Sequence, residues 1–458
     1  MYPASCLSVV SDASNATGPA PLRVGLIGTG VVGSGTCQVL VRNAELIAQR
    51  AGRPIRLTMA AARNLSKAAQ VVGPEVALVS DAWSLVRHPD IDVVVEVMGG
   101  VGLAKDLVLE AIAQGKHVVT ANKALLAMHG AEIFAAADAH GVVVAYEAAV
   151  AVSIPIIKAL REGLAANRIH EVVGIVNGTS NFILSKMNDE GLDFTAALRL
   201  ATELGYAEAD PSFDVDGIDA AHKTALLAAN AFGADVPLDQ VHIQGITDLD
   251  PWDMTCAKAL GYCIKLLGMA RHRQDAIEVR VHPALVPQAH WLAQVQGSMN
   301  GIWVGADAAG PTFHYGAGAG SQTTASAVVA DLIDVARCGS AGDAQRAALR
   351  VPHRSVQANA IQRLPVLPIG QIASRHYLRF ELGDHPEWAL HLSEWLQSVG
   401  IETQQGALVC HPAEGHRDAW LVLTQSLSGD ALAAALVALV QRPGHPAPAA
   451  VWRVEHLG

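Results

Sequence analysis

Long hydrophobic runs, paired cysteine motifs and an excess of basic residues are all missing from this 458-residue sequence. No apolar stretch reaches the ~18 residues that a helix needs to cross a bilayer, so we expect no membrane span. The six cysteines are scattered without CxxC spacing, which argues against a zinc site and favours reduced thiols in a cytoplasmic protein. A formal net charge of −11 argues against nucleic acid as a partner, because phosphate binding requires a basic face.

Hydrophobic residues make up 51% of the sequence and charged residues only 16%, so the chain can bury a large core. Its length allows two to four domains. The first 20 residues lack the basic and apolar segments of a signal peptide. We therefore expect residues 1–20 to form a flexible tail.

A glycine pattern follows the first strand-like run. Arg23–Ile27 is apolar overall and leads into GTGVVG, in which Gly28, Gly30 and Gly33 open a helical pattern. A GxGxxG motif between a strand and a helix is the arrangement that binds a dinucleotide pyrophosphate. Strand-like runs then alternate with helical patterns, which predicts a doubly wound parallel sheet of Rossmann type, an α/β fold. These runs are Ile55–Ala62, Val76–Ser80, Ile91–Val97, His117–Thr120 and Val142–Tyr146.

The end of the second predicted strand bears on the choice of cofactor. The acidic residue that would hold a ribose 2′-hydroxyl is missing there, and Arg63 and Lys67 follow instead. A cation at this place suits the 2′-phosphate of NADP(H), which we therefore prefer over NAD(H). The alternative is an ordinary surface arginine, which leaves NAD(H) possible. Gly99 and Gly100 follow the fourth predicted strand, at the edge where an open parallel sheet collects its ligands.

Charge is concentrated in one stretch, LGYAEADPSFDVDGIDAAHK, residues 204–223. Asp219 and Lys223 are spaced i, i+4 on a predicted helix, so the two side chains share one face. One interpretation is an acidic turn followed by a surface ion pair worth a few tenths of a kcal/mol. The other is a functional site. Lys123, just beyond the fifth predicted strand, is open to the same two interpretations, solvated or catalytic.

The rest of the sequence gives coarser predictions. Asn177 or Thr179 is suited to cap a helix that follows a strand over Arg168–Val176. Helical periodicity dominates from Phe194 to about Leu267, and Val304–Ala330 has the pattern of a glycine-rich loop leading into a helix. After a proline-punctuated linker, the last ninety residues show strands and helices in the order β-α-β-β-α-β. This order predicts a ferredoxin-like α+β unit.

Further motifs stand along the chain, among them GLIGTGVVG, ARNLSK, VVEVMGG, GKHVVTANKALL, YEAAVA, NGTSNFIL and YGAGAGSQTTASAVVAD. Together with residues 204–223 they resemble the homoserine dehydrogenase family over nearly the whole chain. The C-terminal unit is similar to the ACT domain of bacterial members, and no aspartokinase-like segment is found, so the resemblance is to the monofunctional form. It implies an NAD(P)-binding Rossmann domain at 21–150 and a substrate-binding, catalytic and dimerisation domain at 151–345. Within the latter, 318–345 would pack back on the first domain, with a linker at 346–370 and an ACT-like regulatory domain at 371–458.

The resemblance also implies a reaction, the reversible reduction of L-aspartate-4-semialdehyde to L-homoserine in threonine, methionine and isoleucine biosynthesis. Lys223 would be the proton donor, Asp219 would hold its ammonium, and Lys123 would lie near the reacting oxygen and the nicotinamide. Glu208 would bind the α-ammonium group of the substrate. Further substrate contacts are implied for Asp214, Thr179 and Tyr206. Cofactor contacts are implied for Gly28, Thr29, Gly30, Val31, Val32, Gly33, Arg63, Lys67, Gly99, Gly100, Lys123 and Gly318.

Two features of the sequence depart from the family pattern. The family holds a monovalent cation, usually sodium, through backbone carbonyls that correspond to Glu147, Val150, Val152 and Ile154, but AVSIP stands here in place of AGGIP. A valine cannot adopt every backbone conformation that glycine can. In the ACT-like unit, Glu387 replaces a glycine that lets an amino-acid effector approach the backbone. Threonine is therefore only a possible effector, and a homodimer or higher homo-oligomer is the state implied by the resemblance.

Two rival functions remain open at the level of the sequence. One is reduction of another amino-acid semialdehyde, for which Glu208 and Asp214 would be dispensable. The other is a non-catalytic sensor of nucleotides and amino acids, which would need neither Lys123 nor Lys223. Aspartate-semialdehyde dehydrogenase activity is disfavoured, because no cysteine nucleophile lies within the motifs around Lys123, Glu208 and Lys223.

Overall fold

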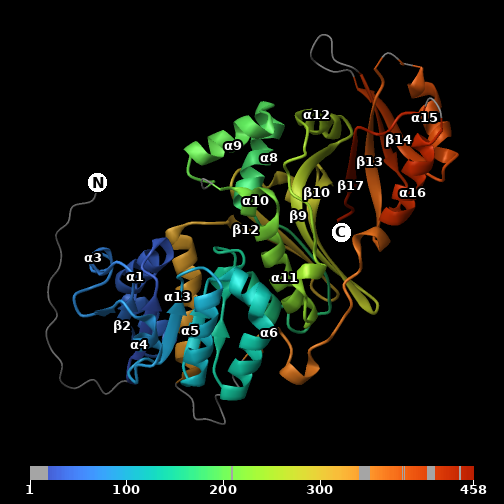
Figure 1. Ribbon diagram of the computed structural model, residues 1–458. Coiled ribbons are helices and arrows are strands. Elements are labelled where there is room, and N and C mark those ends of the chain that lie inside the picture. The colour runs from blue at the N-terminus through green and yellow to red at the C-terminus, as the bar shows by residue number, and fades with distance from the viewer. Residues whose placement is uncertain are drawn as a thin grey trace.

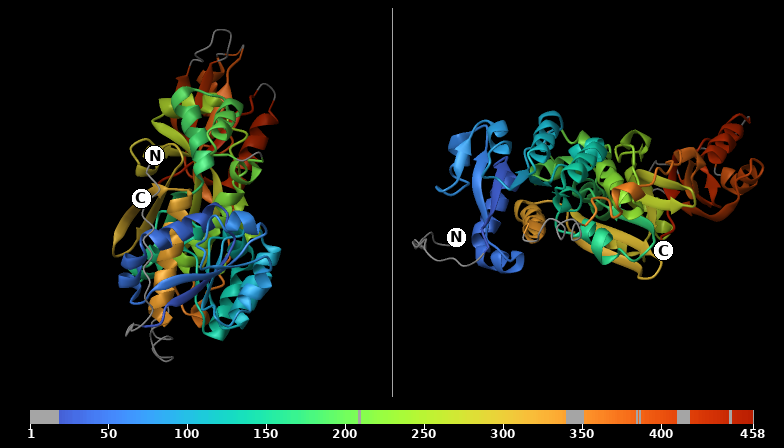
Figure 2. Two further views of the ribbon diagram at one scale, coloured as in Figure 1. Left: turned by 90° about the vertical axis from the view of Figure 1, so that its left-hand side faces the viewer. Right: turned by 90° about the horizontal axis from the view of Figure 1, so that it is seen from below.

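Three parts follow one another along an elongated molecule in this computed structural model (Figures 1 and 2). It describes residues 19–207, 210–339, 351–383, 385, 387–409, 418–442 and 445–457. The N-terminal part and the C-terminal unit lie at opposite ends, with the middle part between them. Most of the predicted tail, residues 340–345 of the returning segment and the start of the predicted linker lie outside the described residues.

The N-terminal part is a six-stranded parallel sheet in the order β3-β2-β1-β4-β5-β6. This order places a reversal between β1 and β4, where doubly wound folds bind their ligands. Val93–Val95 in the centre of the sheet are fully buried, as parallel strands covered by helices on both faces should be. The elements are β1 (Leu22–Ile27), α1 (Val31–Arg42), α2 (Ala44–Ala51), β2 (Ile55–Ala61), α3 (Leu65–Ala68), β3 (Ala77–Val79), α4 (Ala82–Val86), β4 (Val93–Glu96), α5 (Gly102–Ala113), β5 (His117–Thr120), α6 (Lys123–His140) and β6 (Val144–Ala145).

A helix from much later in the chain completes this part. Helix α13 (Ser321–Gly339) packs against α1, where Ser321 Oγ donates to the carbonyl of Val31 at 2.8 Å. A Cβ on Gly35 would lie 2.5 Å from the carbonyl oxygen of Ser321, so glycine allows the two helices to approach closely. Arg337 reaches from the far end of α13 to the carbonyl of Arg50. The first and third quarters of the chain therefore share one core.

The middle part contributes six strands of a second, mixed sheet, with helices on it. Its elements are η1 (Glu147–Ala149), α7 (Ile156–Lys158), η2 (Ala159–Gly163), β7 (Ile169–Ile175), α8 (Gly178–Glu190), α9 (Phe194–Glu203), α10 (Ser212–Val215), α11 (Ile218–Phe232), η3 (Leu238–Gln240), β8 (His242–Ile243), α12 (Pro251–Ala259), β9 (Tyr262–Arg273), β10 (Ala276–Pro287), η4 (Trp291–Gln294), β11 (Met299–Ala306) and β12 (Gly310–Ala317). Strands β12, β11, β7, β9 and β10 are neighbours in that order, and the short strand β8 pairs with β10.

Two sequence predictions for this part are wrong. The helical periodicity predicted up to Leu267 ends earlier, because β9 already begins at Tyr262. Residues 263–270 are all buried, so the strand shows no alternation, and a continuous apolar run cannot be assigned by its period. Over Val304–Ala330 the sequence predicts a glycine-rich loop leading into a helix. The helix is confirmed as α13, but most of the predicted loop belongs to the hairpin of β11 and β12, where Gly305, Gly310 and Gly316 obscure the strand pattern.

The C-terminal unit has the predicted β-α-β-β-α-β order, and its strands pair as β17-β13-β15-β14. This spatial order, with the last strand beside the first, is that of a ferredoxin-like fold. A core of Leu378, Phe380, Leu392, Leu396 and Val422 joins its sheet to its helices. The elements of this region are η5 (Ala358–Ala360), η6 (Ile369–Gln371), β13 (Ala373–Glu381), α15 (Trp388–Gln397), β14 (Thr403–Val409), β15 (Ala419–Thr424), β16 (Leu427–Ser428), α16 (Gly429–Val440) and β17 (Ala450–Val454).

The C-terminal unit shares its sheet with the middle part. Strand β17 pairs in parallel with β10 through Ala284–Arg453 and Leu285–Val454, so the two strand sets form one eleven-stranded sheet. From helix α12, the buried Asp253 accepts hydrogen bonds from Arg379 at 2.8 Å and Trp452 at 3.0 Å. The unit is therefore joined to the middle part by backbone pairing and by buried charge.

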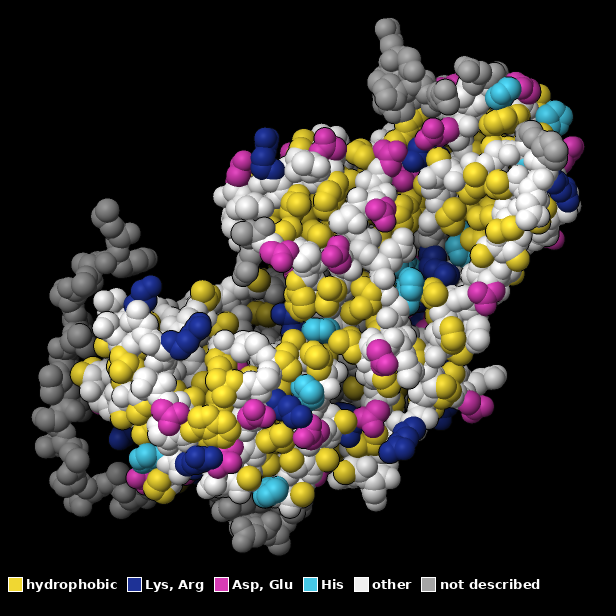
Figure 3. Space-filling model, viewed as in Figure 1, with side chains coloured by type: hydrophobic (Ala, Val, Ile, Leu, Met, Phe, Trp, Pro, Cys, Tyr) yellow, Lys and Arg dark blue, Asp and Glu magenta, His cyan; other side chains and the backbone are white. Residues whose placement is uncertain are grey.

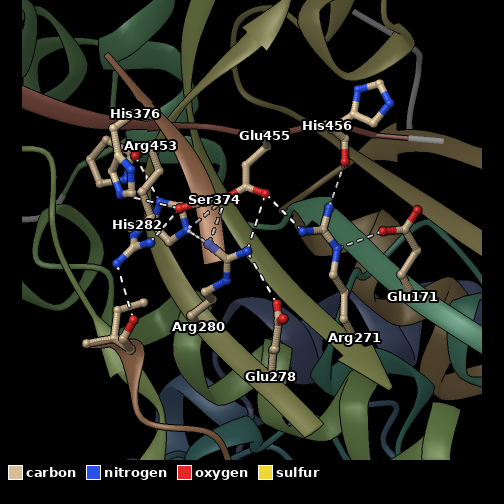
Figure 4. A network of polar contacts seen from close by, with 12 residues as sticks. Glu171, Arg271, Glu278, Arg280, His282, Ser374, His376, Arg453, Glu455 and His456 are labelled. Carbon is tan, nitrogen blue, oxygen red and sulfur yellow. Dashed lines mark hydrogen bonds and ion pairs between the residues drawn. The ribbon is translucent and has the colours of Figure 1, made fainter. Parts of the chain in front are cut away.

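A second buried network lies on the strands themselves (Figure 4). Glu455, which directly follows β17, accepts from Arg280 of β10 at 2.7 Å and from Arg271 of β9 at 3.0 Å. Arg271 also binds Glu171 of β7 at 2.8 Å. Burial would raise the pKa of Glu455, but the charges of Arg280 and Arg271 lower it to about 2. The end of the chain thus compensates charges that the middle part buries.

The outer surface carries both signs of charge. On the face shown in Figure 3, acidic and basic side chains of the described residues are interspersed with hydrophobic ones, and no broad basic area is visible there. Among the described residues, no helix is long and apolar enough to cross a membrane.

Replacing Glu455 by glutamine should destabilise the protein at pH 7, because Arg280 would keep a buried charge with only the longer contact to Glu278, at 3.4 Å, as its ion pair. The loss expected for breaking a buried pair is about 3–5 kcal/mol in unfolding free energy. The folded-state pKa of Glu455 lies below its ordinary value of 4.5, so its stabilisation is present above that pH and disappears as the pH falls towards 2. Urea unfolding at several pH values should therefore show the wild type and E455Q converging in acid.

The control is Glu381→Gln, which removes a carboxylate that is 46% exposed and pairs with Arg379. A loss below about 1 kcal/mol is expected for such a surface pair. Equal unfolding midpoints for E455Q and the wild type at pH 7 would contradict the role given to this network.

Candidate functional site

A cavity of about 810 Å³ lies at the carboxyl edge of the N-terminal sheet. Its walls come from the segments that follow β1, β2, β3 and β4, and Asp81 is among the residues after β3. The residues predicted to bind the cofactor that line it are Gly28, Thr29, Gly30, Arg63, Lys67, Gly99 and Gly100. The structure therefore brings these residues together around one space, of a size that suits an organic ligand.

The three glycines of GxGxxG have different surroundings. Gly28 has φ +101°, and a Cβ there would lie 2.8 Å from the carbonyl oxygen of Val97. A Cβ on Gly33 would lie only 2.1 Å from the carbonyl oxygen of Gly28, so this glycine is needed for the turn to close against α1. A Cβ on Gly30 would meet no atom within 4 Å. Gly30 thus faces open space, which fits a position where backbone approaches a pyrophosphate.

Arg63 and Lys67 stand beside this cavity as exposed cations. Among the described residues neither forms an ion pair. The side chain of Asn64 accepts from the backbone N–H of Lys67 at 3.0 Å and so caps the short helix α3. The two charges are therefore placed at the cavity wall and available to an anionic group. Val31 and Val32 lie in the first turn of α1, and the side chain of Val31 is exposed.

A buried carboxyl group organises the loops at the other side of the cavity. Glu96, at the end of β4, accepts from Thr120 Oγ1 at 2.7 Å and from the N–H of Met98 at 3.0 Å. Burial raises the pKa of Glu96, and these hydrogen bonds only partly offset the effect. Asn122 donates to the carbonyl of Gly100 at 2.7 Å, which joins the cavity wall to the start of α6. Lys123 is the next residue.

The side chains of Lys123 and Lys223 meet at one buried carboxylate. Asp219 Oδ1 lies 3.0 Å from Lys123 Nζ, and Asp219 Oδ2 lies 2.7 Å from Lys223 Nζ. Lys223 also donates to the carbonyl of Val176 at 2.8 Å. Burial alone would raise the pKa of Asp219, but the charges of Lys223 and Lys123 lower it far below its usual value. The Asp219–Lys223 contact is therefore a buried pair, and its interpretation as a surface ion pair is wrong.

Asn177 links this cluster to Asp214. Its Nδ2 donates to Asp214 Oδ1 at 2.7 Å and to Asp219 Oδ2 at 2.8 Å. Its Oδ1 accepts from the N–H of Ser180 at 2.8 Å and caps α8. The sequence indicated only the capping role. The two carboxylates that Asn177 bridges belong to α10 and α11, which lie far from Asn177 in the sequence, so the bridging role could not be predicted from the local pattern.

Thr179 and Tyr206 lie next to each other through their backbone and side chains. Thr179 Oγ1 donates to the carbonyl of Tyr206 at 2.8 Å, and the Tyr206 ring packs at 4.7 Å from that of Phe182. Glu208, which the sequence assigns to the substrate ammonium group, lies outside the described residues. Asp210 accepts from the N–H and the hydroxyl of Ser212, as a turn residue does.

Two residues near the lysines were not predicted. The ammonium of Lys123 lies 5.6 Å from the ring centre of Phe213, a cation–π distance. His222 packs edge-on against the same ring at 5.4 Å. Burial lowers the pKa of His222, and the charge of Asp219 opposes this only in part. His222 directly precedes Lys223 in DGIDAAHK, which is the one sequence signal for it, whereas Phe213 lies earlier, in PSFD, and has no such signal.

The residues implied for a cation lie in the turn after β6. Val150 and Ile154 are buried. Val152 has φ +53°, a left-handed conformation that is unfavourable for a β-branched residue and natural for the glycine it replaces. The Glu147 carboxylate accepts from the N–H groups of Ile157 and Lys158 at 2.9 Å each. The chain thus keeps the backbone path that glycine would favour, at a conformational cost.

Gly318 follows β12 at the entrance to α13. A Cβ there would lie 2.4 Å from Asn300 Oδ1. No described group donates a hydrogen bond to this buried oxygen. Gly318 does not line the cavity that holds Arg63 and Gly30.

Comparison with known proteins assigns the chain to a family. Two family models match it, "Homoserine dehydrogenase, NAD binding domain" over residues 28–147 and "Homoserine dehydrogenase" over residues 155–333. A homoserine dehydrogenase of Pseudomonas aeruginosa is 50% identical over 84% of this chain and 87% of its own length. One of Neisseria gonorrhoeae is 46% identical over 95% and 99%, respectively. The crystal structure of a homoserine dehydrogenase from Thiobacillus denitrificans has a TM-score of 0.89 at 46% identity and covers 96% of this chain and 100% of its own.

The glycines of GTGVVG give a matched pair of variants. Gly33→Ala should destabilise the protein, because its Cβ would lie 2.1 Å from the carbonyl oxygen of Gly28. Gly30→Ala should leave the melting temperature almost unchanged, because its Cβ meets open space, but should weaken dinucleotide binding at least about tenfold if backbone must approach the pyrophosphate. Thermal unfolding and fluorescence titration with NADPH measure the two effects. Tight dinucleotide binding by G30A would contradict the assignment of the cavity.

Proposed function

The chain belongs to the homoserine dehydrogenase family, and from this premise we propose how its own residues carry out the reaction. The activity is that of a nicotinamide-dependent oxidoreductase of amino-acid biosynthesis. The substrates that go with it are L-aspartate-4-semialdehyde and L-homoserine. The observation that carries the proposal is the meeting of Lys123 and Lys223 at Asp219.

We assign the dinucleotide to the cavity beside β1, β2 and β4. The open space at Gly30 and the unpaired Arg63 and Lys67 support this assignment. When bound there, the cofactor would supply the hydride for the aldehyde carbon. Hydrogen bonds of Asn122 and Glu96 hold the loop that contains Gly100, so the start of α6 keeps a fixed position relative to the wall of this cavity.

Lys223 donates the proton that the carbonyl oxygen needs as the aldehyde is reduced. A general acid must be held in hydrogen-bonding reach and aimed at the substrate. Asp219 and the carbonyl of Val176 occupy two of the three N–H directions of this ammonium group, which leaves one for the substrate oxygen. In the reverse reaction the neutral amine of Lys223 takes the hydroxyl proton of homoserine.

Lys123 stabilises the negative charge that develops on the same oxygen. Its ammonium shares Asp219 with Lys223, so the carboxylate aligns both cations. Charges held in fixed positions stabilise the transition state without having to reorient during the reaction. Such preorganised electrostatic stabilisation is usually the largest single contribution to catalysis. Asn177 and Asp214 position Asp219 and the substrate side of the site. Glu208 binds the α-ammonium group, with Thr179 and Tyr206 beside it.

Replacing Lys223 by methionine should lower kcat by about 10²–10⁴-fold, the range for loss of a positioned general acid. Asp219 keeps Lys123 and Asn177 as partners, so the variant should still fold and bind the cofactor. Steady-state assays with homoserine, melting temperature and cofactor titration separate these effects. The control is Lys186→Met, whose ammonium pairs with Glu190 on the surface of α8. Wild-type turnover by K223M would refute the role of Lys223.

We also propose that NADP(H) is preferred over NAD(H). Arg63→Gln should raise the KM for NADPH by about 10–100-fold, the effect of one charge-assisted contact to a phosphate, and should change the KM for NADH little. Arg56→Gln is the control, since Arg56 is an exposed arginine on β2 that does not line the cavity. Equal effects of R63Q on both cofactors would remove the reason for preferring NADP(H).

A monovalent cation, most simply sodium, is proposed at the carbonyls of Glu147, Val150, Val152 and Ile154. The left-handed φ of Val152 supports this, because the chain keeps a strained turn that any valine would otherwise avoid. Activity should rise with sodium at constant ionic strength, with choline chloride as the balancing salt. An activity that is the same in both salts would count against a functional cation.

A further inference from the structure

A second cleft, of about 790 Å³, lies between the middle part and the C-terminal unit, well apart from the catalytic lysines. One wall comes from β7 and β9, and the other from the start of β13, the end of β17 and the segment after β15. Its polar lining includes Glu171, Arg271, Arg273, Ser374, Arg375 and Ser426. The residues behind this cleft are those of the network in Figure 4.

The charges around the cleft do not balance. Arg271 is matched by Glu171 and Glu455, Arg280 by Glu455, and Arg273 by Glu278 at 2.7 Å. Five arginines of the cleft and its network thus stand against three glutamates. The two left over are Arg375 and Arg453.

Arg375 and Arg453 have only neutral partners in the described part of the chain. Arg375 Nε donates to the carbonyl of Thr424 at 3.3 Å. Arg453 donates to Ser374 Oγ at 2.6 Å and to the carbonyl of Ile369. Burial and the charge of Arg280 lower the pKa of Arg453 to about 10, and the charges of Glu455 and Glu278 oppose this only in part.

The histidines of the network do not change this balance of charge. Burial lowers the pKa of His282 to about 3 and that of His376 to about 4, so both rings are neutral near pH 7. The two carboxylates that line the cleft, Glu171 and Glu455, are both held by Arg271. Within the described part of the chain, Arg375 in the wall of the cleft and Arg453 behind it therefore have no carboxylate of their own, in a protein with a net charge of −11.

We propose that this cleft binds a small dianion, a phosphate group or a dicarboxylate, with Arg375 as its direct partner. Two guanidinium charges without a carboxylate of their own among the described residues, one in the wall and one behind it, favour a ligand with two negative charges. The planar fork of an arginine suits carboxylate and phosphate oxygens. The hydroxyl of Ser426 stands exposed at the same wall as a further donor. The site goes beyond the proposed reaction and does not depend on it.

Strand β7 connects this cleft to the catalytic cluster. Glu171 lines the cleft near the start of the strand, and Val176, just beyond its end, accepts from Lys223. Five residues of strand separate them by about 16 Å. The dianion site is thus distinct from the active site but shares a strand with it.

The test is calorimetric titration of the full-length protein at fixed ionic strength, with cofactor at saturation so that the first cavity is filled. Inorganic phosphate and malonate are the dianionic probes, and acetate is the monoanionic one. We expect one site per chain that prefers at least one dianion over acetate by about tenfold or more. The tighter of the two dianions identifies the class of ligand.

Two variants decide the position of the site. Arg375→Gln should weaken the dianion at least about tenfold, and Ser426→Asp should do the same by adding a negative charge at the exposed wall without removing a buried contact. Arg199→Gln, on the exposed face of α9, is the control and should bind as the wild type does. Equal binding of acetate and both dianions, or unchanged binding by S426D in a folded protein, would overturn the proposal.

Discussion

The proposed catalytic arrangement depends on one buried carboxylate, that of Asp219. Asp219 is almost inaccessible to solvent, and a lone carboxylate in that position would cost several kcal/mol. The cost is offset only because Lys123 from the N-terminal part and Lys223 from α11 both reach it, with Asn177 from the end of β7. Three separate stretches of chain must therefore converge before any of them is stable there. The same convergence brings two ammonium groups to one point, the arrangement on which the proposed reduction of an aldehyde rests.

Much of the fold follows from local sequence patterns. The Gly28–Gly33 turn, the parallel sheet and the ferredoxin-like unit are all signalled by short-range periodicity and turn chemistry. Strand β9 could not be predicted in this way, because it is buried on both faces and its sequence therefore shows no alternation of apolar and polar residues. The pairing of β17 with β10 could not be predicted either, because no local sequence pattern indicates that two strands so far apart in the chain will pair.

The candidate site divides in the same way. Lys123, Asp219 and Lys223 stand out by charge in a chain poor in charge, so they are visible in the sequence. Asn177 and Phe213 are ordinary cap and turn residues until the tertiary structure places them beside Asp219 and Lys123. Polar networks of this kind depend on which elements meet in space, and that information is not local.

The pairing of β17 with β10 has a consequence for the time course of biosynthesis. Leu285 of β10 cannot pair until Val454 of β17 has been synthesised, about 170 residues later. At 5–20 residues per second this delay is roughly 10–30 s. During this delay the edge of β10 in the nascent middle part is unpaired. Arg280, which is buried in the finished protein, also lacks its partner Glu455 during this time. Strand β17 therefore completes a sheet whose first strands were translated long before it.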